Sequence, residues 1–237
     1  MSDWKAKRFW KAAGVVPLDN GFAVELDGRA VKTPAKRALL VPTRAMAEAI
    51  AVEWDAQEGV INPLTMPVTR TANAAIDKVA VQYAEVAQML AAYGDSDLLC
   101  YRAEAPEELV ARQAAQWDPM LDWAAQDLGA RLEARTGVMH VAQDPQAVAT
   151  LSRHTHELNA FDLAAFHDLV SLSGSLVLGF AAIRDARPVT ELWDISRLDE
   201  DWQIEQWGED DDATALAATK RAAFLHAKRV IDLSRAD

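Results

Sequence analysis

The spacing of hydrophobic residues changes once along the chain, and this change constrains the fold more than any other feature. Near the start, Phe22, Val24 and Leu26 alternate with Ala23 and Glu25, which is the period of a strand with one apolar face. Two dipeptides that favour tight hairpins flank this segment, namely Asn20-Gly21 and Asp27-Gly28. From residue 43 onward, apolar residues recur every three or four positions, as they do in helices. The sequence therefore predicts an α+β protein in which a small sheet precedes many helices.

A helix follows the predicted strands closely enough to cover their apolar face. Thr43 is a suitable N-cap, and the apolar residues from Met46 to Trp54 fall on one helical stripe that ends before Gly59. Residues 60–69 contain two prolines and have little periodicity, so we place the domain boundary there. The predicted domains are a small β-rich domain over 1–62, with a β-meander and one helix, and a larger all-helical domain over 63–237.

Helical periodicity continues through the second predicted domain. Pro106 and the pair Asp144-Pro145 each open a helix, and residues 174–185 are apolar nearly all round, as expected of a buried central helix. The stretch 132–141 could instead be extended. The remaining helices are expected over residues 72–94, 161–172, 188–207 and 211–234.

The charge balance excludes some classes of partner. Lys and Arg number 24 against 36 Asp and Glu, a net charge of −12, whereas binding to nucleic acid or to an anionic membrane needs an excess of cations.

The longest strongly apolar stretch, 176–183, is too short to span a membrane, and the first residues lack the pattern of a secretory signal. A single cysteine allows no internal disulfide and favours a reducing compartment. We expect a monomeric protein that binds no nucleic acid, does not insert into a membrane and is located in the cytoplasm.

Two residues are candidates for hydrolytic catalysis. The segment from Gly94 to Leu98 partly resembles the nucleophile block of a lipase and esterase family, with Ser96 as its serine, and Cys100 lies nearby. That block should follow a strand and needs an Asp-x-x-His partner near the C-terminus. Here it follows a predicted helix, and no such partner is present. We therefore expect no enzyme activity and keep a small hydrolase using Ser96 or Cys100 as the alternative.

The sequence predicts neither a metal site nor a bound cofactor. His154 and His156 are two positions apart, so on a helix they point to roughly opposite sides and cannot bind one ion together. No cysteine cluster, His-Glu-x-x-His motif or glycine-rich phosphate loop occurs.

The most unusual segment is rich in tryptophan and acid and runs from Leu198 to Asp212. On a single helix over 188–207, Asp199 falls in the apolar arc formed by Leu192, Ile195, Leu198 and Trp202. Glu200 falls inside a second apolar patch, formed by Trp193, Ile204 and Trp207. A buried carboxylate needs a partner, so Asp199 is expected to pair with an Arg or Lys of a neighbouring helix. Glu200 is either an ordinary rim residue or an exposed acidic hot spot for a partner protein, and residue chemistry alone does not choose between them.

Seven segments in a fixed order resemble the alphaproteobacterial and mitochondrial assembly chaperones, called ATP-twelve, of the F(1) sector of ATP synthase. The most distinctive is the acidic-Trp-Gln-x-x-x-Trp-Gly block of residues 199–208. The other six are Lys7-Arg8-Phe9-Trp10, Leu26-Asp27-Gly28-Arg29 with Lys32-Thr33-Pro34, Glu53-Trp54-Asp55-Ala56-Gln57, Met66-Pro67-Val68-Thr69, Asp97-Leu98-Leu99-Cys100-Tyr101-Arg102 and Trp117-Asp118-Pro119.

The resemblance implies a chaperone that binds the newly made alpha subunit of F(1)-ATPase and shields it until a beta subunit takes its place, without catalysis. It also implies an essential acidic residue among Asp199, Glu200 and Asp201, of which we favour Glu200; the family has Glu where this chain has Asp201. The neighbouring residues expected to contact the partner are Trp193, Trp202, Gln203 and Trp207. Mitochondrial members carry a targeting extension into the matrix, whereas this chain begins with the family's start and so resembles a bacterial cytoplasmic member.

Overall fold

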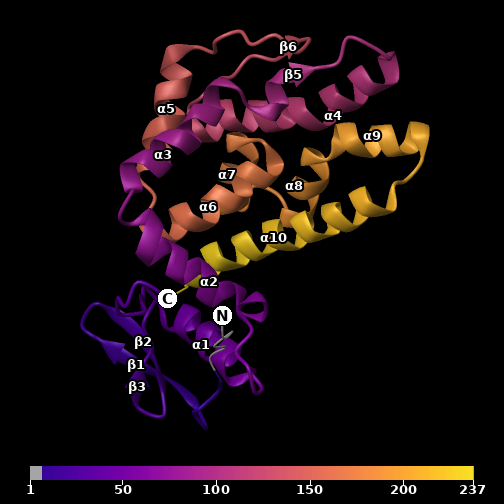
Figure 1. Ribbon diagram of the computed structural model, residues 1–237. Coiled ribbons are helices and arrows are strands. Elements are labelled where there is room, and N and C mark those ends of the chain that lie inside the picture. The colour runs from indigo at the N-terminus through magenta and orange to yellow at the C-terminus, as the bar shows by residue number, and fades with distance from the viewer. Residues whose placement is uncertain (1–6, 237) are drawn as a thin grey trace. The chain divides into compact units, whose positions relative to one another are not determined.

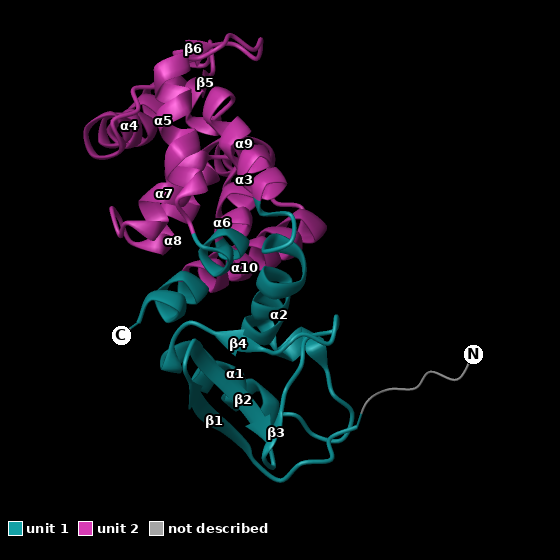
Figure 2. Cartoon of the chain, turned by 90° about the vertical axis from the view of Figure 1, so that its left-hand side faces the viewer, with its two compact units in different colours: residues 1–83, 159–165, 229–237 teal, residues 84–158, 166–228 magenta. Residues whose placement is uncertain are grey.

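The computed structural model describes residues 7–236, which form two compact units. Of the described residues, unit 1 comprises 7–83, 159–165 and 229–236, and unit 2 comprises 84–158 and 166–228 (Figure 2). Both units are therefore discontinuous in sequence. The domains predicted from the sequence, 1–62 and 63–237, stay a prediction.

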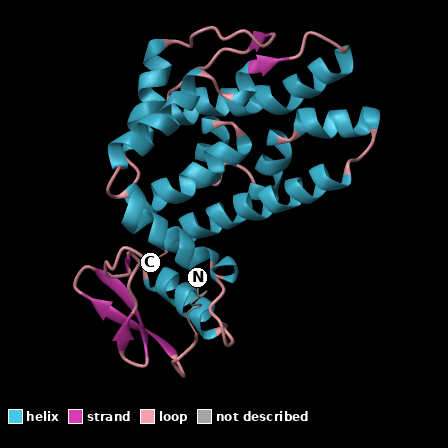
Figure 3. Ribbon diagram, in the orientation of Figure 1, coloured by secondary structure: helices cyan, strands magenta, loops and turns pink. Residues whose placement is uncertain are grey.

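Unit 1 contains a four-stranded sheet built around one central strand (Figure 3). This strand, β2 (Gly21–Leu26), pairs antiparallel with β1 (Ala13–Leu18) along its whole length. Two shorter strands, β3 (Arg29–Ala30) and β4 (Leu40–Val41), pair with the end and the start of β2. The predicted meander is therefore confirmed, and its core residues Val24 and Leu26 are buried.

The two hairpins differ in how they use their predicted turn dipeptides. Asp27 and Gly28 both have positive φ, 48° and 78°, as a two-residue hairpin turn requires. In the first hairpin, however, Gly21 already belongs to β2, and Asp19 and Asn20 form the turn. Gly21 serves a different purpose there, because a Cβ on it would lie 2.5 Å from the carbonyl oxygen of Val41. Glycine at this position lets β4 approach β2.

Helix α1 (Arg44–Asp55) packs against β1 and β2. Thr43 caps it as predicted, since its side-chain oxygen accepts the N–H of Met46 at 3.1 Å. The face turned to the sheet is buried and consists of Met46, Ala47, Ile50 and Ala51. The single helix thus supplies the apolar layer without which so small a sheet would be marginal.

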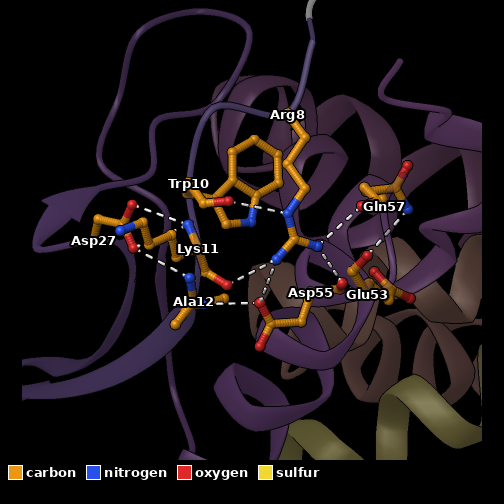
Figure 4. Close-up of polar contacts among 9 residues, drawn as sticks. Arg8, Trp10, Lys11, Ala12, Asp27, Glu53, Asp55 and Gln57 are labelled. Carbon is orange, nitrogen blue, oxygen red and sulfur yellow. Dashed lines mark hydrogen bonds and ion pairs between the residues drawn. The ribbon is translucent and has the colours of Figure 1, made fainter. Parts of the chain in front are cut away.

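A hydrogen-bond network fastens the first described residues to the end of α1 (Figure 4). The Arg8 guanidinium donates to the backbone carbonyls of Trp10, Lys11 and Gln57 at 3.0, 2.9 and 2.9 Å, and also to that of Asp55. These bonds satisfy carbonyls on both segments at once. The contacts of Arg8 therefore give it a structural role within unit 1.

Carboxylates of two further motifs also bind backbone groups. Asp27 accepts the N–H groups of Lys11 and Ala12 (Figure 4), which lowers the pKa of its carboxyl. Glu53 accepts the N–H groups of Val68 and Thr69 at 2.7 and 2.8 Å, so it caps the N-terminus of α2 (Pro67–Ala74). These motif residues thus stabilise the unit itself.

Unit 2 is mostly helical (Figure 1). At its centre α7 (Leu176–Ile183) is buried at every position, as predicted. Around it lie α4 (Glu107–Trp123), which continues through Pro119, and α5 (Pro145–His156). Its other helices, some of which extend into unit 1, are α3 (Tyr83–Ala91), α6 (Ala160–Ser173), α8 (Val189–Ser196), α9 (Leu198–Trp207) and α10 (Asp211–Arg235).

Three expectations for the helical part need correction. The helix predicted over 72–94 is interrupted: α2 ends at Ala74, a π-helical turn covers Ala75–Val79, and α3 starts at Tyr83. The helix predicted over 188–207 is two helices. Of the stretch 132–141, only β6 (Arg135–Thr136) is a strand, and it pairs in parallel with β5 (Tyr101–Arg102). The α+β class itself is confirmed.

Candidate functional site

Side-chain hydrogen bonds separate α8 from α9. In a continuous helix, the carbonyls of Trp193 and Ile195 would accept the N–H groups four residues later. Instead, the Ser196 hydroxyl donates to the Trp193 carbonyl at 2.6 Å, and the Trp117 indole N–H donates to the Ile195 carbonyl at 2.9 Å. The chain leaves the helical conformation at Arg197, with φ −102° and ψ 5°. The prediction of one helix is therefore wrong.

This break removes the apolar patch that a single helix would form around Glu200. Trp193 points into the core and packs against Phe224, with ring centroids 5.6 Å apart. Trp207 lies at the end of α9 and is 80% exposed. Because Trp193 is buried and Trp207 is not, the predicted Trp193, Ile204 and Trp207 patch is wrong.

The three acidic residues at the start of α9 have different surroundings. Asp199 accepts a hydrogen bond from the Gln113 side-chain amide at 2.7 Å, so its partner is an amide and not the predicted Arg or Lys. Glu200 forms an ion pair with Arg197 at 2.7 Å. Asp201 is exposed, and its carboxylate has no ion pair or hydrogen bond within residues 7–236. Partial burial raises the pKa of Asp201, with smaller contributions from neighbouring carboxylates.

A second link joins α9 to α4. Arg112 makes two parallel bonds to Glu205, at 2.7 and 2.9 Å, and its guanidinium lies 4.8 Å from the centre of the Trp202 ring. The hydrogen bond from Arg112 lowers the pKa of Glu205. Together with the Gln113–Asp199 bond, this pair fixes the spacing of the two helices.

A groove of about 500 Å³ opens between these helices. One wall is a stripe of α9, at positions that share one helical face. The opposite wall is the start of α4 with the segment around β5, and the loop after β6 contributes Gly137 and Val138. The lining includes the apolar or aromatic side chains of Tyr101, Leu109, Val138, Trp202 and Trp207, and the polar side chains of Arg102, Gln113, Asp199 and Gln203.

The groove brings together only part of the predicted site. It includes Asp199, Trp202, Gln203 and Trp207, but Glu200, Asp201 and Trp193 do not line it. Sequence reasoning missed the opposite wall. Tyr101 lies within one of the family-like segments and could have been found from it, whereas Leu109 and Val138 carry no such signal.

Arg102 and Ala103 also line the groove, and side-chain contacts hold this part of the wall in place. Arg102 donates to the Leu99 carbonyl at 2.8 Å, pairs with Asp118 at 2.8 Å and lies over the Trp117 ring. The Gln113 side-chain oxygen accepts the N–H of Ala103 at 2.8 Å. The backbone at β5 is thus held on α4.

The geometry does not activate either hydrolase candidate. Cys100 is buried, and this burial raises the pKa of its thiol to about 12, so almost no thiolate forms near neutral pH. Ser96 is exposed, but within residues 7–236 no hydrogen bond joins its hydroxyl to a histidine.

The described chain also offers no metal-binding cluster of three or more His, Cys, Asp or Glu residues. One of the two neighbouring histidines, His154, instead makes a hydrogen bond to the Leu128 carbonyl at 3.1 Å. Among the described helices, none has the length and apolarity needed to cross a membrane.

The chain is similar to several known proteins. Residues 7–125 match the family described as ATP12 chaperone protein. The crystal structure of Atp12 from Paracoccus denitrificans has a TM-score of 0.96 and 48% sequence identity, with 98% of this chain and 100% of that chain covered. A mutant of the same protein gives the same TM-score and identity.

Relatives with lower sequence identity are also similar to this chain. A crystal structure from Agrobacterium tumefaciens has a TM-score of 0.89 and 43% identity, over 95% of this chain and 84% of that one. The mitochondrial protein atp12 of Schizosaccharomyces pombe is 26% identical over 219 residues, which is 87% of this chain and 75% of the relative. The resemblance found in the sequence is thereby confirmed, and the chain belongs to the ATP12 chaperone family.

Proposed function

We propose that this protein binds the free alpha subunit of F(1)-ATPase, prevents its aggregation and promotes assembly of ATP synthase. Membership of the ATP12 chaperone family supports a chaperone role. The choice of the alpha subunit follows from the resemblance of the sequence segments and is part of the proposal. We propose that the protein acts as a monomer in the cytoplasm of a bacterium, without a catalytic step.

The observation that carries the proposal is the groove between α4 and α9. Its exposed apolar side chains would be left in water in the free protein, which is the usual mark of a surface that another protein covers. Tryptophan and charged residues at the centre of a patch are also typical of binding hot spots. The proposed contact residues are those predicted from the sequence: Asp199, Glu200, Asp201, Trp202, Gln203 and Trp207, with Trp193 supporting them from the core.

The test uses purified alpha subunit and the full chain. At a near-stoichiometric ratio the protein should suppress the light scattering of aggregating alpha subunit, and the two should co-elute in gel filtration. Failure to bind alpha subunit in both assays would refute the proposal.

Single substitutions can then identify the essential acid. We expect that one of Asp199→Asn, Glu200→Gln and Asp201→Asn weakens alpha-subunit binding by about 1–3 kcal/mol, the scale of a charged hot spot. Asp122→Asn is the matched control, because Asp122 is an exposed acid on α4 that does not line the groove. Circular dichroism separates lost binding from lost folding. Equal alpha-subunit affinities for all four variants would show that Asp199, Glu200 and Asp201 do not belong to the binding site.

A further inference from the structure

The groove has a mainly apolar lining with few groups that could recognise a charge. Trp207 is 80% exposed and Val138 is 90% exposed, and they lie on the α9 wall and on the loop after β6. Leu109 and Tyr101 also line the groove, beside the polar side chains of Arg102, Gln113, Asp199, Gln203 and Gln206. A volume of about 500 Å³ is large enough to enclose one or two bulky side chains.

The cations near the groove are already paired. Arg102 pairs with Asp118, and Arg112 is held by both oxygens of Glu205. Each guanidinium already has a carboxylate partner that offsets its charge and weakens its attraction for an anionic ligand, so the groove suits an acidic segment poorly.

Carboxylates, by contrast, are exposed at both ends of the two walls. Asp199, which is half-buried, uses one oxygen for Gln113, and this neutral amide brings no positive charge to the carboxylate. The segment before α4 and its first turn carry exposed acids, and so does the segment that follows α9. These acids are Glu104, Glu107, Glu108, Glu209, Asp210, Asp211 and Asp212.

We propose that the groove binds a peptide segment of the client that carries a bulky apolar side chain flanked by lysine or arginine. The apolar side chain enters between Leu109 and Trp202, and the flanking cations meet the acidic ends of the walls. A second copy of this chain fits poorly, because each copy carries a net charge of −12 and would bring acids to acids. This inference rests on the proposed function and names the chemistry that its site recognises.

The first experiment measures the affinity of groove variants for the alpha subunit. Val138→Lys places a cation in the groove, and Trp207→Ala removes an apolar side chain from its α9 wall. We expect each to weaken binding by about tenfold or more. The control is Met89→Lys, which changes the same charge at an exposed apolar residue of α3 outside the groove, and we expect its affinity to stay within about twofold of the original.

The second experiment uses a probe that does not depend on the alpha subunit. A fluorescent synthetic peptide of alternating leucine and lysine pairs should bind the full chain, and anisotropy should show weaker binding to Val138→Lys than to Met89→Lys. The same peptide with glutamate in place of lysine should bind at least about tenfold more weakly.

The outcomes separate the two proposals. If the alpha subunit binds the original protein and all three variants equally, the groove inference is overturned and the proposed function stands. If the alpha subunit does not bind at all, the proposed function fails, and the peptide decides the groove: discrimination between the two peptides supports it, and equal binding refutes it.

Discussion

The negative charge that residues 199–208 expose to solvent depends on which of their carboxylates are paired with a cation. Glu200 and Glu205 are each paired with an arginine, so their charge is largely compensated. Asp199 receives only a neutral amide from Gln113, and Asp201 is exposed. The Gln113 amide satisfies part of the hydrogen bonding of the half-buried Asp199 without adding a compensating positive charge. The block therefore keeps negative charge at its surface even though most of its members have partners.

The burial of Cys100 makes a prediction about its reactivity. With a thiol pKa of about 12, the thiolate fraction at pH 8 is on the order of one in ten thousand. We expect the folded protein to resist alkylation by iodoacetamide at pH 8, and the protein in urea to react fully. Mass spectrometry of the labelled chain measures both. Rapid labelling of the folded protein would show an accessible, activated thiol and would return the hydrolase alternative to consideration.

At the scale of elements, the local pattern of apolar and polar residues predicted those helices and strands whose formation depends on residues close in sequence. Alternation predicted the β1–β2 hairpin, a polar cap predicted the start of α1, and an unbroken apolar run predicted the buried α7. Each of these signals lies within the element that it describes.

The same pattern could not reveal breaks that distant residues cause. The donor that occupies the Ile195 carbonyl is Trp117, which is 78 residues away in sequence. Since no glycine or proline marks the junction of α8 and α9, the sequence favours one helix, and on one helix Trp193 and Glu200 would share a patch that the structure does not form. The α9 wall of the groove was predicted in part, whereas its opposite wall depends on tertiary packing.

Replacing Trp117 tests the cause of this break. Trp117→Phe keeps an aromatic ring but leaves the buried Ile195 carbonyl without its donor, which should cost about 1–3 kcal/mol in the free energy of unfolding. Urea unfolding measures the loss. Trp123→Phe is the control, since Trp123 is a less buried tryptophan near the end of the same helix. An equal loss in both variants would show that ring volume, and not the hydrogen bond, matters at position 117.

At the scale of the whole molecule, a net charge of −12 keeps copies apart in solution and gives the surface one prevailing sign. Overall charge does not identify a binding site. Its effect on binding is to speed the approach of a partner that presents cations, while short-range contacts hold the complex once it has formed.

Because long-range charge affects association and short-range contacts affect dissociation, salt should change the two rates of client binding differently. Raising the ionic strength from 50 to 500 mM shortens the Debye length from roughly 14 to 4 Å. The association rate with the alpha subunit should therefore fall by about tenfold, while the dissociation rate, governed by the apolar groove, should change by less than about threefold. Surface plasmon resonance separates the two rates. Trp207→Ala should show the opposite pattern at constant salt, with faster dissociation and an almost unchanged association rate, because Trp207 is a neutral contact in the groove. An association rate that does not respond to salt would mean that the acidic ends of the groove take no part in attracting the client.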